Sequence, residues 1–123
     1  MTAPGATKSI IDSVVALINE NGRAVTLIKD SPGFISQRIR AMIGNLGCEM
    51  AQIELATPDD IDLAMRLGLN YPMGPFEIID DFVSELADKI MSIMQEISGV
   101  DRYRPSPWLR RLDLLGLGAH VMP

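Results

Sequence analysis

The residues of this chain that could carry out acid–base chemistry are few, and the acidic ones are clustered. Aspartates lie close together at Asp59, Asp60 and Asp62, and again at Asp80 and Asp81. Neighbouring carboxylates can divide the roles of general acid and general base between them. Both clusters fall in the first turn or two of a predicted helix, where the helix dipole stabilises negative charge. We therefore interpret them as helix-start and surface residues.

The one histidine and the one cysteine are weak candidates for a reactive site. His120 lies close to the end of the printed sequence, and we expect it in a disordered tail. Cys48 falls in a predicted helix among small residues, which favours a packed thiol over a reactive one. A lone cysteine forms no intramolecular disulfide, and metal binding needs several ligands in register. We expect no metal site.

Nucleotide binding has little support in the sequence. A dinucleotide site needs a Gly-x-Gly-x-x-Gly turn after a strand, whereas Gly116 and Gly118 follow a predicted helix. The formal net charge of −5 argues against a nucleic-acid partner. We interpret the one basic concentration as a solvated face, with a phosphate-bearing ligand or a partner surface as the alternative. It consists of Arg102, Arg104, Arg110 and Arg111.

Length and composition predict one soluble domain. A chain of 123 residues with 47% hydrophobic residues can bury a core. No apolar run reaches about 18 residues and no secretory signal is recognisable, so we expect no membrane span and a cytoplasmic location.

Apolar periodicity predicts five helices and one strand, with loose tails at residues 1–6 and 117–123. The expected helices span residues 8–20, a long stretch opened by residues 30–33, a stretch from Pro58 to Gly68, residues 75–98 and residues 108–115. Asp30 or Ser31 is the expected cap of the long helix. Residues 24–29 form the expected strand, whose pairing partner is missing from the chain.

One aliphatic seam in the predicted helix 75–98 has two interpretations. Its members follow alternating steps of four and three, as in a coiled coil: Ile79, Val83, Leu86, Ile90, Ile93 and Ile97. The seam is either intramolecular core or a subunit interface. Because the unpaired strand edge also needs cover, we expect a homodimer.

Residues 69–77 (Leu-Asn-Tyr-Pro-Met-Gly-Pro-Phe-Glu) separate two of these helices and predict a rigid bend. Four segments then resemble, in order, the C-terminal domain of 3-hydroxyacyl-CoA dehydrogenases. They are residues 24–34, residues 56–62 (Ala-Thr-Pro-Asp-Asp-Ile-Asp), residues 66–76, with Asn70 in place of a glycine, and residues 102–109 (Tyr-Arg-Pro among them). The likeness is greatest to the second copy of this domain in bacterial enzymes that carry it twice.

The resemblance implies an all-α fold of the 6-phosphogluconate-dehydrogenase C-terminal type, with about five helices and one N-terminal strand. It implies one domain over residues 7–116, within which residues 7–29 would complete a Rossmann domain. It also implies a substrate-facing wall. The residues that we carry over to this wall are Ser31, Phe34, Gln37, Tyr71, Pro72, Met73, Gly74 and Pro75.

The family reaction is the NAD-dependent oxidation of a 3-hydroxyacyl-CoA, in fatty acid or phenylacetate breakdown. Its His–Glu pair and its cofactor fold belong to an N-terminal domain that this sequence does not show, so we expect no cofactor-binding residues here. Gln37 stands at the family's asparagine position, and the family's closing Gly-Arg-Lys-Thr-Gly-Arg-Gly-Phe-Tyr stretch is absent. Both departures indicate a copy that does not carry out the chemistry.

Three hypotheses follow. The chain is a dimerisation and acyl-CoA-cleft domain that is not catalytic alone; or it is a subunit that completes the active site of a separate Rossmann protein through Gln37; or it is a helical interaction module without acyl-CoA contact.

Overall fold

The computed structural model describes residues 2–82 and 84–121, which form two compact units. The first unit runs to Phe34 and the second starts at Ile35. None of the helices in the described ranges combines the length and the apolar character needed to cross a bilayer.

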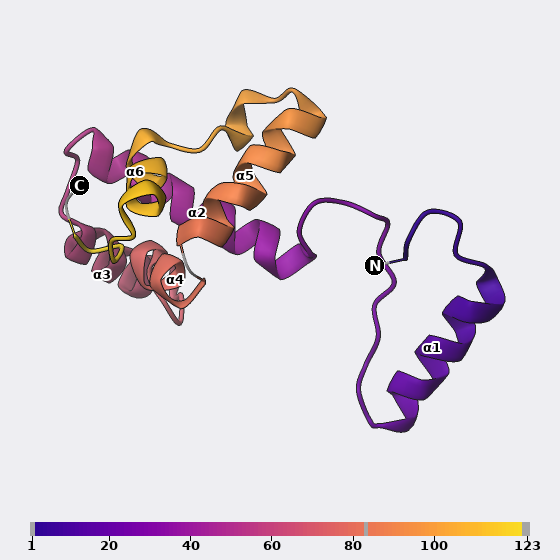
Figure 1. The fold of residues 1–123 in the computed structure, drawn as a ribbon. Coiled ribbons are helices and arrows are strands. Elements are labelled where there is room, and N and C mark those ends of the chain that lie inside the picture. The colour runs from indigo at the N-terminus through magenta and orange to yellow at the C-terminus, as the bar shows by residue number, and fades with distance from the viewer. Residues whose placement is uncertain (1, 83, 122–123) are drawn as a thin grey trace. The chain divides into compact units, whose positions relative to one another are not determined.

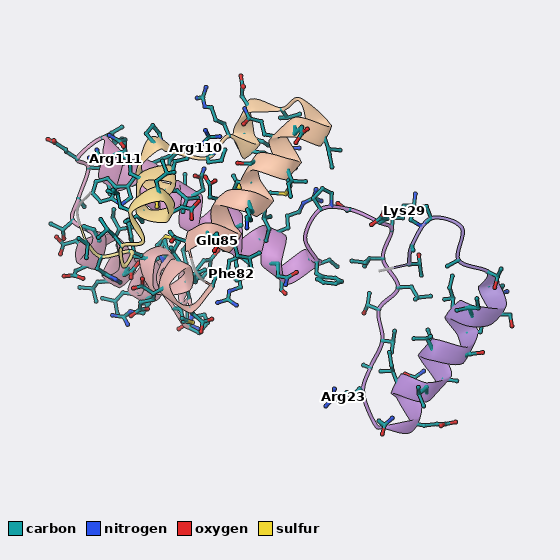
Figure 2. The ribbon with its side chains drawn as sticks, viewed as in Figure 1. Arg23, Lys29, Phe82, Glu85, Arg110 and Arg111 are labelled. Atoms are coloured by element: carbon teal, nitrogen blue, oxygen red, sulfur yellow. The ribbon has the colours of Figure 1, made fainter. Side chains whose placement is uncertain are left out.

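The first unit contains one helix followed by an extended segment. Helix α1 (Lys8–Glu20) has the predicted bounds, and the chain leaves it through Gly22, whose φ is +70°. Arg23 and Lys29 mark the two ends of the extended segment (Figure 2). A shallow apolar groove of about 240 Å³ lies between α1 and this segment, lined in part by Ile10 and Val25.

The predicted strand at residues 24–29 is wrong. These residues carry no strand, and none occurs elsewhere in the part of the chain that the structure describes. The reason is that a strand exists through hydrogen bonds to a neighbouring strand. The backbone of residues 24–29 stays extended without making a ladder.

The second unit is built around one central helix (Figure 1). Helices α3 (Pro58–Leu69), α4 (Pro75–Phe82), α5 (Ser84–Ser98) and α6 (Pro107–Leu115) all contact α2 (Ile35–Gln52). A short 3₁₀ helix, η1 (Asp101–Tyr103), packs against α5. The largest fully buried side chains come from four of these helices and include Phe76, Ile79, Met91, Met94, Leu109 and Leu112.

Capping residues explain where two helices begin. Thr57 precedes Pro58, and its hydroxyl accepts the backbone N–H of Asp60 at 3.2 Å. Ser106 does the same for the N–H of Leu109. In both helices a hydroxyl cap is followed by a proline at the first helical position. This combination is a strong local signal for the start of a helix.

Two helix boundaries differ from those predicted, because the backbone turns left-handed at other residues. Gly33 has a φ of +65°, and α2 starts at Ile35, later than the predicted opening at residues 30–33. Asn70 has a φ of 55°, so α3 continues through Gly68 and ends at Leu69. Asparagine is among the few non-glycine residues that tolerate this conformation.

The predicted helix 75–98 is described as α4 and α5, on either side of Val83. Val83, a member of the aliphatic seam, lies outside the described residues. Ile79 and Ile90 are buried, whereas Ile93 is 44% exposed and Ile97 is 69% exposed. Part of the seam therefore belongs to the core and part of it faces outward.

Helix α2 buries its small residues, whereas two of its large aliphatic residues face outward. A Cβ atom at Gly44 would lie 2.6 Å from Cγ1 of Ile79, and one at Gly47 would lie 2.5 Å from Cβ of Pro75. Another helix therefore approaches these glycines closely, and that helix is α4. The opposite side of α2 presents Ile39 and Leu46, both at least half exposed.

We predict that Gly47→Ala destabilises the second unit by about 1–3 kcal/mol, because the new methyl group overlaps the rigid ring of Pro75. Urea unfolding followed by the fluorescence of Trp108, which is buried in this unit, measures the change. Gly68→Ala is the matched control. Its Cβ meets nothing within 4 Å, so this variant gains about 0.5–1 kcal/mol from helix propensity. Equal stability of the two variants would contradict the prediction.

Candidate functional site

The bend between α3 and α4 is held by the buried carboxylate of Asp62, a residue of α3. Its Oδ1 accepts the backbone N–H of Phe76 at 2.8 Å, and its Oδ2 accepts that of Glu77 at 3.0 Å. Both N–H groups belong to the first turn of α4. The N–H groups of a first turn have no acceptors within their own helix. Asp62 is only 2% exposed. It therefore caps α4 from a neighbouring helix.

Gly74 is required because Asp62 lies directly against it. A Cβ atom at Gly74 would overlap the Asp62 side chain. The N–H of Gly74 donates to Oε2 of Glu77 at 2.8 Å, and Oε1 of Glu77 accepts from Nη1 of Arg66 at 2.7 Å. This is one half of a capping box; Gly74 has no side chain to supply the other half, and Asp62 accepts the N–H of Glu77 in its place. The bend is thus tied to both helices that it joins.

His120 completes this cluster, and its interpretation as a disordered tail residue is wrong. Its Nε2 lies 3.1 Å from Oδ2 of Asp62, and its Nδ1 lies 3.1 Å from Oδ2 of Asp80. The backbone N–H of Ala119 also donates to Oδ1 of Asp80, at 2.7 Å. The ring centroid of His120 lies 5.8 Å from that of Phe76. The predicted tail at residues 117–123 is therefore attached to the core as far as residue 121; residues 122 and 123 lie outside the described ones.

The two carboxylates determine the charge of this histidine. Partial burial lowers the pKa of His120, but hydrogen bonds to Asp80 and Asp62 and the attraction of their charges outweigh it. The pKa of the imidazole is therefore raised above its ordinary value.

The interpretation of Asp62 and Asp80 as dipole and surface residues was incomplete. Asp62 lies three residues before the partly buried Met65, so helical spacing places the two on one side of α3. Nothing in the sequence pairs either aspartate with a histidine about 40 or more residues away.

A groove of about 460 Å³ runs along the exposed side of α2 and reaches the bend. Its apolar lining comes from α2, and Tyr71 of the bend and Arg102 of η1 also line it. The residues of α2 in the lining are Ile39, Met42, Ile43, Asn45, Leu46 and Glu49. A concave apolar surface with a few polar groups is typical of small-molecule sites.

The buried amide of Asn45 holds the segment that carries Arg102. Its Nδ2 donates to the carbonyl of Arg104 at 3.2 Å, and its Oδ1 accepts the N–H of Ser106 at 2.7 Å. Close by, the guanidinium carbon atoms of Arg38 and Arg102 lie 5.8 and 4.9 Å from the ring centroid of Tyr103. Of these arginines only Arg102 lines the groove, and Glu49 lines it too, so the groove carries one side chain of each charge.

The structure separates the predicted wall residues by exposure. Gly74 and Pro75 are buried, and their neighbours are Asp62 and Gly47 respectively, so they shape the bend. Tyr71 lines the groove.

Pro72 is exposed, and Met73 is partly buried. Gln37 lies partly buried in the first turn of α2. Ser31 and Phe34 belong to the first unit. A direct ligand contact at the bend would therefore use Tyr71, Pro72 or Met73.

Cys48 is a packed thiol, as predicted. Its side chain is fully buried, and burial raises the pKa of Cys48 to about 12, although a hydrogen bond with Ser106 opposes this. The thiolate needed for reactivity is therefore scarce near neutral pH. Within the described ranges no group of three or more acidic, histidine or cysteine side chains is arranged to hold a metal ion.

The basic concentration comes from different elements of the second unit. Arg102 lies on η1, whereas Arg110 and Arg111 lie on α6 (Figure 2). Nε of Arg110 lies 3.8 Å from Oδ1 of Asp88, so this arginine pairs with a nearby acid. Only Arg102 reaches the groove.

The family described as "3-hydroxyacyl-CoA dehydrogenase, C-terminal domain" has a sequence model that matches residues 33–120. A probable 3-hydroxybutyryl-CoA dehydrogenase from Deinococcus radiodurans is 36% identical over 96 residues, which make up 78% of this chain and 34% of that protein. A 3-hydroxyadipyl-CoA dehydrogenase from Escherichia coli is 37% identical over 101 residues, 82% of this chain and 21% of that protein. The chain thus spans about a third or less of these relatives.

Two crystal structures have the same fold. An (S)-3-hydroxybutyryl-CoA dehydrogenase from Ralstonia eutropha matches with a TM-score of 0.86 and 26% identity, over 96% of this chain and 44% of that one. A 3-hydroxybutyryl-CoA dehydrogenase from Escherichia coli matches with a TM-score of 0.84 and 34% identity, over 92% of this chain and 24% of that one. The all-helical fold implied by the sequence resemblance is confirmed.

We predict that Asp62→Ala destabilises the second unit by about 2–4 kcal/mol, because it leaves one buried and one partly buried N–H group of α4 without an acceptor. The control is Asp81→Ala, which removes an exposed carboxylate paired with Arg40 and changes stability by less than about 1 kcal/mol. Urea unfolding measures both. A similar, small effect of the two variants would show that Asp62 does not hold the bend.

Proposed function

This chain belongs to the family of 3-hydroxyacyl-CoA dehydrogenase C-terminal domains, and from that membership we propose that it supplies one wall of an acyl-CoA cleft and a subunit contact. In this proposal it does not oxidise substrate alone. The redox step, the NAD-dependent oxidation of a 3-hydroxyacyl-CoA in fatty acid or phenylacetate breakdown, belongs to the complete dehydrogenase. We place that enzyme in the cytoplasm.

The observation that carries the proposal is the groove beside the bend. Four aliphatic or thioether side chains of α2 line it, which suits an acyl chain, and Tyr71 brings the family's bend into it. Arg102 of η1 lines the groove beside Glu49, and its guanidinium group suits the negative charge of an acyl-CoA. Apolar and cationic groups thus lie side by side, as an amphipathic anion requires.

The described residues do not fit a nicotinamide dinucleotide. A pyrophosphate needs the turn between a strand and a helix, and the extended segment at residues 24–29 makes no sheet. Gly116 caps the end of α6, and a Cβ atom at Gly118 would lie 3.8 Å from the carboxylate of Asp80. An acidic neighbour would repel phosphate. In this proposal NAD is held by another domain.

We propose that the exposed part of the aliphatic seam forms a homodimer contact. Leu86, Ile93 and Ile97 of α5 are all at least 41% exposed. Contiguous exposed apolar side chains of this kind are typical of protein interfaces. The groove on α2 and the seam on α5 are lined by different residues, so ligand binding and dimerisation can be tested separately.

The two other hypotheses remain distinct proposals. The chain could complete the active site of a separate Rossmann protein through Gln37, in which case the apolar groove of the first unit would be a contact for that protein. Alternatively, it is a helical interaction module, in which case the groove on α2 binds no acyl-CoA.

We predict that acetoacetyl-CoA binds to the chain, and that Tyr71→Ala weakens the binding about tenfold because one aromatic wall of the groove is lost. Calorimetric titration measures the affinity. Leu67→Asp is the control, since Leu67 is 77% exposed on α3 and does not line the groove.

The same preparation, mixed with NAD and 3-hydroxybutyryl-CoA, should form no NADH. Turnover by the chain alone would contradict the division of labour that we propose. If neither CoA nor acetoacetyl-CoA gives a binding heat, the interaction-module hypothesis is favoured.

We predict that the chain sediments as a dimer at concentrations on the order of tens of micromolar, and that Ile93→Asp converts it to a monomer by placing a charge in the contact. Leu114→Asp serves as the control because Leu114 is 82% exposed on α6, away from the seam. A wild-type chain that sediments as a monomer would rule out this contact.

A further inference from the structure

Asp62 is a buried carboxylate, and such a group needs a counter-charge. Its side chain is only 3% exposed, and the desolvation of an unpaired ion is expensive. Among the ion pairs of the described residues, His120 is its one cationic partner. The neutralisation of Asp62 therefore depends on a residue that gains and loses its proton near neutral pH.

His120 is unsuited to be a catalytic base, because both of its ring nitrogens already face carboxylates. Nε2 lies 3.1 Å from Asp62 and Nδ1 lies 3.1 Å from Asp80. Only the protonated imidazole can donate to both at once. The neutral ring would direct one lone pair at a carboxylate oxygen. The arrangement thus favours the protonated state as a link between α3 and α4.

The segment around His120 is attached at several points. We call residues 117–121 the C-terminal clip. The N–H of Leu117 donates to the carbonyl of Leu112 at 3.1 Å, and Leu117 packs against the core. Ala119 is 1% exposed, and its N–H donates to Asp80. The clip therefore brings His120 to Asp62 with little freedom of position.

We propose that the C-terminal clip is a pH-sensitive latch on the bend between α3 and α4. With His120 protonated, the latch holds Asp62 in place against Gly74 and the first turn of α4. With His120 neutral, the latch opens and the bend, including Tyr71 in the groove, loosens. The consequence for ligand binding rests on the proposed function, whereas the latch itself does not.

The charged groups around His120 all favour its protonated form. Asp62 and Asp59 face it from α3, the latter with Oδ1 at 3.7 Å, and Asp80 faces it from α4. On the same two helices, Glu77 is paired with Arg66 and Asp81 with Arg40. The pKa of His120 is raised in the folded chain. Its stabilising contribution is therefore complete below the ordinary pKa and is lost as the pH rises through the raised one.

The latch predicts local opening at high pH. Long-range proton–nitrogen spectra of the imidazole follow the protonation of His120. Amide hydrogen exchange at Phe76 and Glu77, the two N–H groups held by Asp62, follows the bend. Between about pH 6 and about pH 9, bracketing the titration of histidine, we expect protection at these two amides to fall severalfold after correction for base catalysis. The core amides of Met91 and Leu109 should keep their protection.

Two variants make the test specific. His120→Gln keeps an amide donor without the charge, so Phe76 and Glu77 should be weakly protected at both pH values. Asp80→Asn removes one carboxylate and should lower the titration midpoint of His120. It remains informative if the first variant does not fold.

The proposal is overturned if His120 titrates at its ordinary pKa, if protection at Phe76 and Glu77 is the same at both pH values, or if the core amides lose protection equally. All of these measurements are made without ligand. A failure of acyl-CoA binding therefore leaves the result for the latch unchanged.

Discussion

The burial of the Asp62 carboxylate is the interaction on which the rest of the second unit depends. It satisfies the first N–H groups of α4, and in doing so it requires a glycine at Gly74. Pro75 then lies against Gly47 of the central helix. One carboxylate thus links α3, the bend, α4 and α2. A carboxylate is suited to this task because it can accept several hydrogen bonds at once, and because the positive end of a helix stabilises its charge.

The central helix explains why this domain exposes apolar surface. Its small residues, Gly44 and Gly47 among them, allow α4 to approach closely. Ile39 and Leu46 face the other way, where they line the groove. Outward-facing Ile93 and Ile97 on α5 add a second apolar surface. These surfaces suit a domain that contacts a ligand or another polypeptide, as one part of a dehydrogenase would.

Where helices begin and end was largely predictable, because capping is local. Thr57 with Pro58, and Ser106 with Pro107, start helices as the sequence indicates, and α1 has its predicted bounds. The exceptions are the boundaries at Gly33 and Asn70, each of which depends on the positive φ angle of a single residue. Composition does not reveal such an angle. The strand at residues 24–29 failed for another reason, since its existence depends on a neighbour rather than on its own residues.

The sequence by itself determined the family, the helical content and the bend at residues 69–77, because motifs and periodicity are properties of short segments. It did not determine that Asp62, Asp80 and His120 meet, since they lie on three segments brought together only by packing. It also did not determine which apolar residues are buried. Helical spacing shows which residues share a face. Only the approach of α4 to the glycines of α2 decided that the small-residue face lies inside and that Ile39 and Leu46 lie outside.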